Sequence, residues 1–458
     1  MTAVLTCALV LLLAACGTGE AVDDPGAGTG QEGGRGMAAN MEHLGSQDSL
    51  ADSLLVRTDD PELREMARRL LPDLARRSGL ELREPVRIAR RTREELVNYL
   101  TAKLNEDLPP ERAESVTATY ELLGLLPEGF DLREILLSVY TEQVAGFYDP
   151  DSVALFVMDD QPAASLETVL IHELVHAVQD QATDLDSLTA PARGNDRQVA
   201  AQAAIEGHAT VVMLEHLMEQ AAGQAVDLSE IPDFTSQVRP ALESLRGQYP
   251  ALAGAPRVIQ ESLLFPYVEG AGYVQALWQV ESGRPAPFGV HLPQSSEQVL
   301  ELAREPEEGW DVPTRVTLRI ASADADAGGV DRDGGNGAAA GDGGTDLDPV
   351  YENSLGEMEV RILLEEVAGA DLAGIDVGWD GDQYALFRDA DGGESLVWYS
   401  VWDSTDDRNA FLARLEPALE RMPRVAGLES LDVAGRPGVL LEIGDPPRIR
   451  VSLSEEGA

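Results

Sequence analysis

The sequence predicts an α+β protein with a mostly helical core and a small C-terminal α+β module. Apolar residues recur every three or four positions over much of residues 61–142 and 165–280, which is the spacing of helices. Shorter apolar runs near residues 144–158 and beyond residue 380 have the period of strands. The stretch 321–349, dominated by Gly, Ala and Asp, has no periodicity and predicts a linker between the two parts.

Composition excludes several classes of function. The chain has 458 residues, a formal net charge of −47 and a pI near 4.3, which excludes a nucleic-acid binder that works through a basic surface. The same charge argues against direct docking on anionic lipid headgroups. Hydrophobic residues make up 44% of the chain, enough to fill real cores, so a wholly disordered acidic protein is excluded as well. The length suits two or three domains.

The N-terminus predicts a secretory signal and a lipid anchor. Residues 5–15 form an apolar run that is shorter than the roughly 20 residues of a membrane-spanning helix. The run ends in small residues before Cys16 and resembles a bacterial lipobox, so we expect 1–16 to be the signal and Cys16 to carry the lipid. Residues 17–60, rich in Gly, Asp and Glu, predict a flexible acidic tether. An ordinary signal with an incidental Cys16 is the alternative.

The first folded part, residues 61–142, is expected to be a helical region with one strand at 86–88. Residues 144–158 then predict a β-hairpin, with its turn at Asp149-Pro150-Asp151. A helix follows, for which Ser165 is a plausible N-cap. Asn195 or Asp196 can cap the next long helix, expected over about 198–222, and further helices continue to residue 280.

The C-terminal module is expected over residues 350–458. Its expected elements, in order, are a helix at 354–367, a hairpin of 384–387 with 396–402, a helix from Ser404 to about Met422, and strands at 428–433 and 439–443. Trp379, Trp398 and Trp402 are expected in the core of this module, with a ligand platform as the less favoured interpretation.

The strongest functional signal is an HExxH motif, His172-Glu173-Leu174-Val175-His176. His172 and His176 lie four residues apart, hence on one helix face, where both imidazoles can reach one metal ion. Glu173 flanks that face, close enough to accept a proton from a metal-bound water. The alternative is a pair of surface histidines, but apolar residues surround the motif and predict a buried helix. Unpartnered imidazoles would be costly there, and a zinc ion would satisfy them.

A catalytic zinc needs a third protein ligand. The extended motif HExxHxxGxxH would require Gly and His where this chain has Gln179 and Ala182. The best downstream candidate is Glu206, an acidic residue in an otherwise apolar helix. Gly207 next to it would let that helix approach the motif helix closely.

These segments resemble the gluzincin type of zincin metallopeptidases, in particular a group of bacterial metallopeptidase lipoproteins. The resemblance covers roughly residues 143–302. It is carried by the HExxH motif and by several supporting segments, which are Gly146-Phe147-Tyr148-Asp149-Pro150, Glu206-Gly207, Phe265-Pro266-Tyr267 with Gly270, and Ser295 to Leu300. It implies a zincin-like catalytic core at 143–320, in which the hairpin before the motif forms an edge strand that pairs with an extended peptide.

The resemblance also implies roles for single residues. Zinc would be held by His172, His176 and Glu206, with Glu173 as the general base. Asp180, one turn after His176, would orient a ligand. His208 takes a place where similar proteins often have Asp, and it points too far around the helix to bind the metal beside Glu206. A donor must also stabilise the developing oxyanion. Tyr267 is preferred for this role, and its rivals are Tyr148, Tyr273, His208 and His216.

The expected function is therefore that of a zinc metallopeptidase, lipid-anchored through Cys16 on the extracytoplasmic side of the bacterial cell envelope. Its expected partners are a peptide or protein substrate and the membrane, with no nucleic acid. Two alternatives remain open. One is a non-catalytic envelope lipoprotein that uses a zincin-like scaffold for binding or assembly, although the intact Glu173 disfavours it. The other is a secreted hydrolase without an anchor.

Overall fold

The computed structural model describes residues 55–231, 239, 247, 249–304, 311–321, 348–372 and 377–454. Cys16 and nearly all of the expected linker at 321–349 lie outside these residues. The expected tether does not extend to residue 60, because Val56–Arg57 form strand β1 and Val56 is buried. Asp60 then caps the first described helix, α3 (Pro61–Ser78), by accepting from the backbone N–H groups of Glu62 and Leu63.

A four-stranded sheet supports the helical part of the molecule. Its spatial order is β1, β2 (Val86–Arg91), β4 (Ala154–Met158) and β3 (Gly146–Asp149). β1, β2 and β4 run parallel, whereas β3 returns antiparallel to β4 as the predicted hairpin and forms one edge of the sheet. Between β2 and β3 lie helices α4 (Arg93–Asp107), α5 (Pro110–Leu122) and α6 (Leu132–Gln143).

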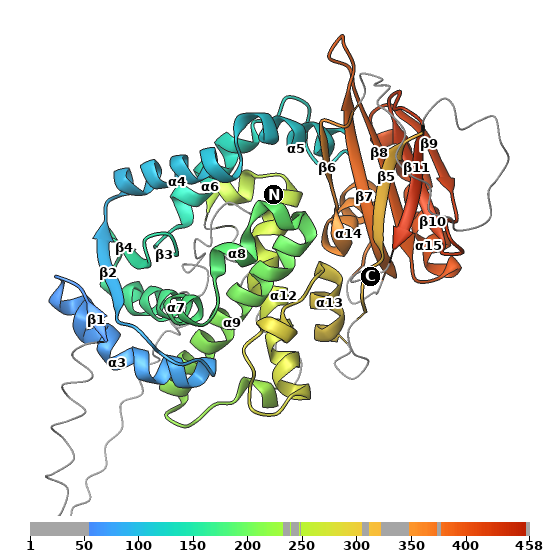
Figure 1. Cartoon of the computed structure of the whole chain (residues 1–458). Coiled ribbons are helices and arrows are strands. Elements are labelled where there is room, and N and C mark those ends of the chain that lie inside the picture. Colours follow the sequence, from blue (N-terminus) through green and yellow to red (C-terminus); the bar gives the residue numbers. More distant parts are fainter. Residues whose placement is uncertain are drawn as a thin grey trace, which may run out of the picture.

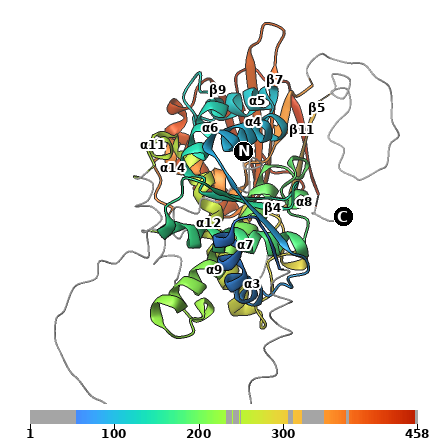
Figure 2. The ribbon, with the colours of Figure 1, turned by 90° about the vertical axis from the view of Figure 1, so that its left-hand side faces the viewer.

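Three long helices form the core that carries the HExxH motif. They are α7 (Ala163–Ala182), α9 (Asn195–Ala222) and α12 (Arg257–Val280). α3, α7 and α9 contact one another, and both views show them side by side (Figures 1 and 2). Shorter helices complete this part, namely α8 (Leu185–Thr189), η2 (Pro191–Arg193), η3 (Leu228–Glu230), α11 (Pro250–Gly254), η4 (Gly289–His291) and α13 (Ser296–Arg304).

Gly207 lets two helices pack closely, but not the two expected from the sequence. A Cβ atom on Gly207 would lie 2.1 Å from the backbone carbon of Gly270 on α12. A Cβ on Gly270 would lie 2.2 Å from the carbonyl oxygen of Ala203 on α9. The close approach is therefore between α9 and α12, and α7 contacts α9 elsewhere.

The expected N-caps of α7 and α9 are wrong. α7 begins at Ala163 after Pro162, and the Ser165 hydroxyl donates to the Pro162 carbonyl within the first turn. α9 begins at Asn195 after Gly194, which has φ 88°. The Asn195 amide instead donates to Glu359, 2.8 Å away, and the Asp196 carboxylate accepts from Ser296. These side chains are used in tertiary contacts, which a local capping pattern does not reveal.

The C-terminal module contains a five-stranded antiparallel sheet. The order is β6 (Tyr351–Asn353), β7 (Trp379–Arg388), β8 (Glu394–Trp402), β10 (Gly438–Ile443) and β9 (Val425–Ser430). The sheet includes the predicted hairpin, which is formed by β7 and β8. One face packs on α14 (Gly356–Val367) and α15 (Thr405–Leu415), and η6 (Glu416–Arg421) continues α15. Trp379, Trp398 and Trp402 are buried, which confirms them as core residues.

A second layer covers the other face of this sheet. β5 (Arg315–Ile320) pairs antiparallel with β11 (Ile449–Ser454). Val316 and Leu318 of β5 pack in one apolar cluster with residues of β7, β8 and β10. β5 thus belongs structurally to the C-terminal module, although it precedes the expected linker. The α+β fold class predicted from the sequence is confirmed.

The helical part and the C-terminal module lie next to each other (Figure 1), and residues of both belong to one buried apolar cluster. Glu359 on α14 accepts a hydrogen bond from Tyr120 on α5 at 2.6 Å and one from Asn195 on α9 at 2.8 Å. α13 also packs against α14. Within the described ranges, no helix combines the length and apolar character needed to cross a bilayer.

Candidate metal centre

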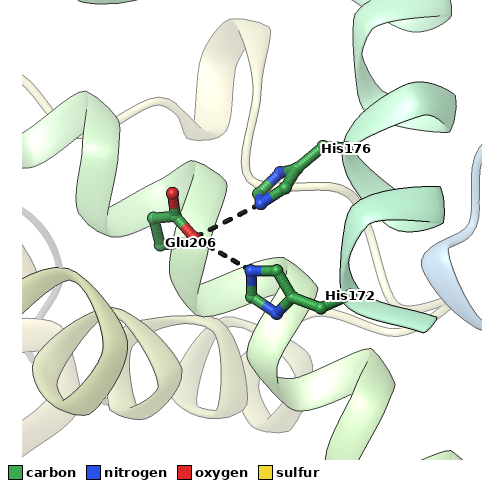
Figure 3. Close-up of side chains that lie close together, drawn as sticks. All are labelled: His172, His176 and Glu206. Atoms are coloured by element: carbon green, nitrogen blue, oxygen red, sulfur yellow. Dashed lines mark hydrogen bonds and ion pairs between the residues drawn. The ribbon is translucent and has the colours of Figure 1, made fainter. Parts of the chain in front are cut away.

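Helix α7 places the HExxH motif in the middle of the helical core. β3, β4, α3 and α9 all contact this helix, which explains why apolar residues occupy almost every position around the motif. His172, Glu173 and His176 have no exposed surface, and Glu206 on α9 is only 3% exposed. Figure 3 shows the two imidazoles projecting from α7 toward the carboxylate of Glu206 on the facing helix.

His172, His176 and Glu206 converge on one point. The Oε2 atom of Glu206 lies 3.1 Å from His172 Nε2 and 3.3 Å from His176 Nε2 (Figure 3). One ligand atom from each of the three residues lies within 4.8 Å of the others. Nitrogen and oxygen ligands about 2.0–2.1 Å from one tetrahedral zinc lie about 3.3 Å apart, so the separations and donor types fit zinc.

The charges in the centre favour a negatively charged Glu206. Burial raises the pKa of Glu206, but the charge of His176 and hydrogen bonds from both imidazoles outweigh it and lower the pKa to about 2. Burial lowers the pKa of His172 despite Glu206. Burial also lowers the pKa of His176, but the charge of Glu206 outweighs burial and raises this pKa to about 9. A buried carboxylate thus faces two imidazoles that compete for one proton, and a cation can replace that proton.

Glu173 lies on the side of α7 that faces the edge strand β3. A Cβ atom on Gly146 of β3 would be 2.7 Å from Val169 Cγ1 of α7, so Gly146 lets β3 approach α7 closely, and Glu173 Cγ would be 3.5 Å from the same atom. Its two buried oxygens have no hydrogen-bond partner of normal geometry in the described part of the chain. Burial, followed by the charge of Glu206, raises its pKa to about 8 against the opposing effects of His176 and the Tyr148 N–H.

Gln179 orients His176, a role that the sequence analysis missed. Its Oε1 lies 2.8 Å from His176 Nδ1, so this nitrogen donates and Nε2 is left to face Glu206. The Gln179 amide nitrogen donates to the carbonyl of Ile205 at 3.0 Å and contacts His208 Nδ1 at 3.1 Å. The sequence signal for this role was a polar residue three positions after His176 in an otherwise apolar helix.

His208 reaches the centre only through Gln179. Its ring packs edge-on against Trp278 and Phe288, with centroids 6.0 and 5.9 Å away. Burial lowers its pKa to about 3, so the ring is neutral and Nδ1 can accept from the Gln179 amide. As expected, His208 is not in the group of converging ligands.

Asp180 does not contact either histidine of the motif. Its carboxylate accepts from the Tyr148 hydroxyl at 2.8 Å and from the Leu185 backbone N–H at 3.4 Å. The expected orienting role therefore belongs to Gln179, and Asp180 instead ties α7 to the edge strand β3. One residue of difference along the helix turns the side chain by about 100°, which explains the change of partner.

Tyr267 is the expected oxyanion donor that lies beside the ligands. Its ring centroid is 6.2 Å from that of His172. The polar groups of its rivals bond elsewhere, because Tyr148 donates to Asp180, Tyr273 donates to the carbonyl of His291, and His216 bonds Asp73 and Gln220. Those contacts tie structural elements together and do not involve the converging ligands.

A cavity of about 400 Å³ lies away from the converging ligands. It is lined by the start of α9, the segment entering β5, and parts of β7, and none of His172, Glu173, His176 and Glu206 belongs to its lining. The residues of the candidate centre are themselves buried.

Comparison with known proteins gives a match in the C-terminal module. A family model described as a domain of unknown function (DUF8575) matches residues 346–447, which include the five-stranded sheet with α14 and α15. No curated protein and no solved structure matches the chain. The C-terminal module is therefore similar to a family without a described function, and the function of the candidate metal centre has to be inferred from its own residues.

Proposed function

We propose that this chain is a zinc-dependent hydrolase, a metallopeptidase in which Glu173 is the general base. The observation that supports it is the convergence of His172, His176 and Glu206 at 3.1 and 3.3 Å, with the carboxylate of Glu173 next to them in the same helix. Three ligands of this kind leave a fourth zinc position open, as catalytic sites require. A purely structural zinc site would need a fourth protein ligand. Among the described residues, no fourth ligand belongs to the converging set.

Each residue has a chemical task in this proposal. A bound zinc would supply a Lewis acid that polarises a carbonyl and lowers the pKa of water. Glu173 takes the proton of the attacking water and passes it to the leaving amine. Gln179 holds His176 in the tautomer that presents Nε2. Tyr267 donates to the developing oxyanion.

The peptide substrate would lie along β3. This strand forms an edge of its sheet and passes Glu173 at Gly146, so an extended chain added to it would cross the base. Main-chain hydrogen bonds would then align the scissile bond with little side-chain selectivity. Because β3 and the ligands are buried, substrate binding requires displacement of the residues that cover them.

The proposal places the enzyme on the extracytoplasmic side of the bacterial envelope through lipid on Cys16. Its substrates would then be envelope or secreted peptides and proteins. Incorporation of labelled fatty acid by the wild type in a bacterial host, with none in Cys16→Ser, checks the anchor. No label in the wild type would contradict it and favour the unanchored, secreted form, and equal labelling of both chains would mean that the lipid is not on Cys16.

Hydrolysis of a peptide library by the zinc-loaded chain tests the activity. We expect cleavage by the wild type and a rate lower by about 10²–10⁴ in Glu173→Gln, which keeps the size of the side chain but cannot accept the proton. Tyr267→Phe should reduce kcat by about 10²–10³ without a change in bound zinc. Zinc-loaded wild type that cleaves nothing, or Glu173→Gln that cleaves equally well, would favour the non-catalytic scaffold.

A further inference from the structure

A second group of carboxylates lies outside the HExxH centre. Glu297 in the first turn of α13, Asp311 before β5 and Asp403 after β8 each direct one oxygen to a common point, and these oxygens lie within 4.8 Å of one another. Glu297 and Asp311 lie 14 positions apart, and Asp403 comes from the C-terminal module. No His or Cys belongs to this group.

Glu297 is the unusual member of the group. It is 1% exposed, and its Oε2 atom is fully buried with no hydrogen-bond partner in the part of the chain that the structure describes. Buried carboxylates are costly unless they are paired, hydrogen-bonded or bound to a metal. The first turn of a nine-residue helix offsets only part of this cost.

The acidic neighbours of Glu297 further raise the free energy of its ionised form. Burial is the largest effect, and the charges of Glu357, Glu301, Asp403 and Asp311 add to it, so its pKa lies well above the usual range. The Arg361 guanidinium lies 3.4 Å from Glu357, which is one of these acidic neighbours. The buried Oε2 atom of Glu297 thus lies near four other carboxylates and has no hydrogen-bond partner among the described residues.

We propose that Glu297, Asp311 and Asp403 bind one calcium ion. Calcium takes six to eight oxygen ligands at about 2.3–2.6 Å, so two oxygens on the same ion can be as far apart as about 5 Å. The three carboxylates satisfy this spacing, and backbone carbonyls or water can supply the remaining ligands. The all-oxygen donor set disfavours zinc, which prefers nitrogen and sulfur.

The ion would connect the two parts of the molecule. α13 packs on α9 and α12 of the helical core, whereas Asp403 begins the connection from β8 to α15 in the C-terminal module. The Asp403 backbone N–H donates to the carbonyl of Gly378 at 3.0 Å, which fixes this connection against the start of β7. Calcium binding would thus hold the module against the core, independently of the HExxH centre.

Calorimetric titration of the full chain with calcium chloride, after removal of bound ions, tests this site. We use about 0.15 M KCl, which screens exposed charges beyond about 8 Å. One calcium per chain is expected. Glu297→Gln and Asp403→Asn should each raise the Kd by at least about tenfold, because each removes one charged ligand. Asp406→Asn is the matched control, since Asp406 is exposed three residues from Asp403 and lies outside the group. Its Kd should equal that of the wild type.

Thermal unfolding gives a second measurement. Without calcium, Glu297→Gln should unfold at the same or a higher temperature than the wild type, because the variant lacks the buried charge. With calcium, the wild type should gain stability and the variant should not. Absence of a saturable site in the wild type, or an equal Kd in wild type, Glu297→Gln and Asp403→Asn, would overturn the proposal. Zinc content and hydrolysis are measured separately, so failure here leaves the proposed function untouched.

Discussion

Gln179 and Asp180 are adjacent in α7, but only Gln179 acts on the candidate metal centre. Gln179 bonds His176, Ile205 and His208, whereas Asp180 bonds Tyr148 and Leu185. The motif residues were predictable because the spacing of His172, Glu173 and His176 is itself the chemical requirement. The partner of Gln179 depends on how α9 packs against α7, and this information is not local in the sequence.

Replacement of Gln179 should weaken zinc binding. Gln179→Leu removes the acceptor for His176 Nδ1, which frees the ring to rotate and to change tautomer. We expect the Kd for zinc to rise about 10–100-fold. Competition with a chromophoric zinc chelator measures this Kd.

Gln181→Leu is the control for this substitution. Gln181 is on the same helix, but it bonds the backbone of Arg83 and Glu84 instead of the centre. Its Kd for zinc should equal that of the wild type. If Gln179→Leu binds zinc as tightly as Gln181→Leu, Gln179 does not position His176 for zinc binding.

α9 is the helix on which the geometry of the centre depends, because it carries Glu206 and, one residue later, the close contact with α12. The sequence predicted this helix from its apolar spacing and predicted Glu206 from its acidic character in an apolar setting. The prediction that Gly207 would face the motif helix was wrong, because Gly207 faces Gly270 on α12. Glu206 and Gly207 are adjacent and point in different directions, so α9 contacts α7 with one face and α12 with another.

Gly207→Ala should separate α9 from α12. The new Cβ atom would lie 2.1 Å from backbone atoms of Gly270, and backbone cannot move aside as a flexible side chain can. We expect a loss of about 1–3 kcal/mol in the free energy of unfolding, as for other overpacked interiors. Denaturant unfolding of the zinc-free chain measures it.

Gly254→Ala is the matched substitution for Gly207→Ala. Gly254 is also helical, but a Cβ atom there would meet nothing within 4 Å. It should unfold at the same or a slightly higher denaturant concentration than the wild type. If Gly207→Ala unfolds at the same concentration as Gly254→Ala, the contact between α9 and α12 is looser than described.

Across the whole molecule, the positions of helices and strands could be predicted from the sequence better than the pairing of the strands. Both hairpins, the helical core and the tryptophan core of the C-terminal module follow from local periodicity and turn residues. The parallel pairing of β1 with β2 and the pairing of β5 with β11 join segments far apart in the chain. Such pairings depend on tertiary packing, which explains why β1 was expected to be tether and β5 was expected to lie in the catalytic core.

Buried acids should make the folded chain more stable at mildly acidic pH. Burial, with the charges of Asp382 and Glu359, raises the pKa of Asp196 to about 7 against hydrogen bonds from Ser296. Burial likewise raises the pKa values of Asp107 and Asp186 to about 6. The folded state keeps protons that the unfolded state releases above about pH 4, so these groups contribute stability that is lost as pH rises toward about 7.

Groups with lowered pKa values act in the opposite direction. Burial lowers the pKa of His208 to about 3, so its contribution is lost as pH falls below about 6.5, which offsets part of the effect of the three acids. Hydrogen bonds from Arg77, His216 and Arg76 outweigh burial and lower the pKa of Asp73 to about 2, so its contribution is lost only as pH falls below about 4. We therefore expect the zinc-free chain to unfold at a higher denaturant concentration at about pH 5 than at about pH 8. Asp196→Asn should reduce this difference. Equal or greater stability at the higher pH would contradict the expected protonation of these acids.

Zinc content per chain, measured by mass spectrometry on protein never exposed to a chelator, tests the central claim most directly. Wild type and Glu173→Gln should each hold one zinc, because Glu173 is not one of the three converging ligands. Glu206→Ala should lose most of it, since one of the three ligands is removed. Folded wild type without zinc, or Glu206→Ala that retains as much zinc as the wild type, would contradict the account.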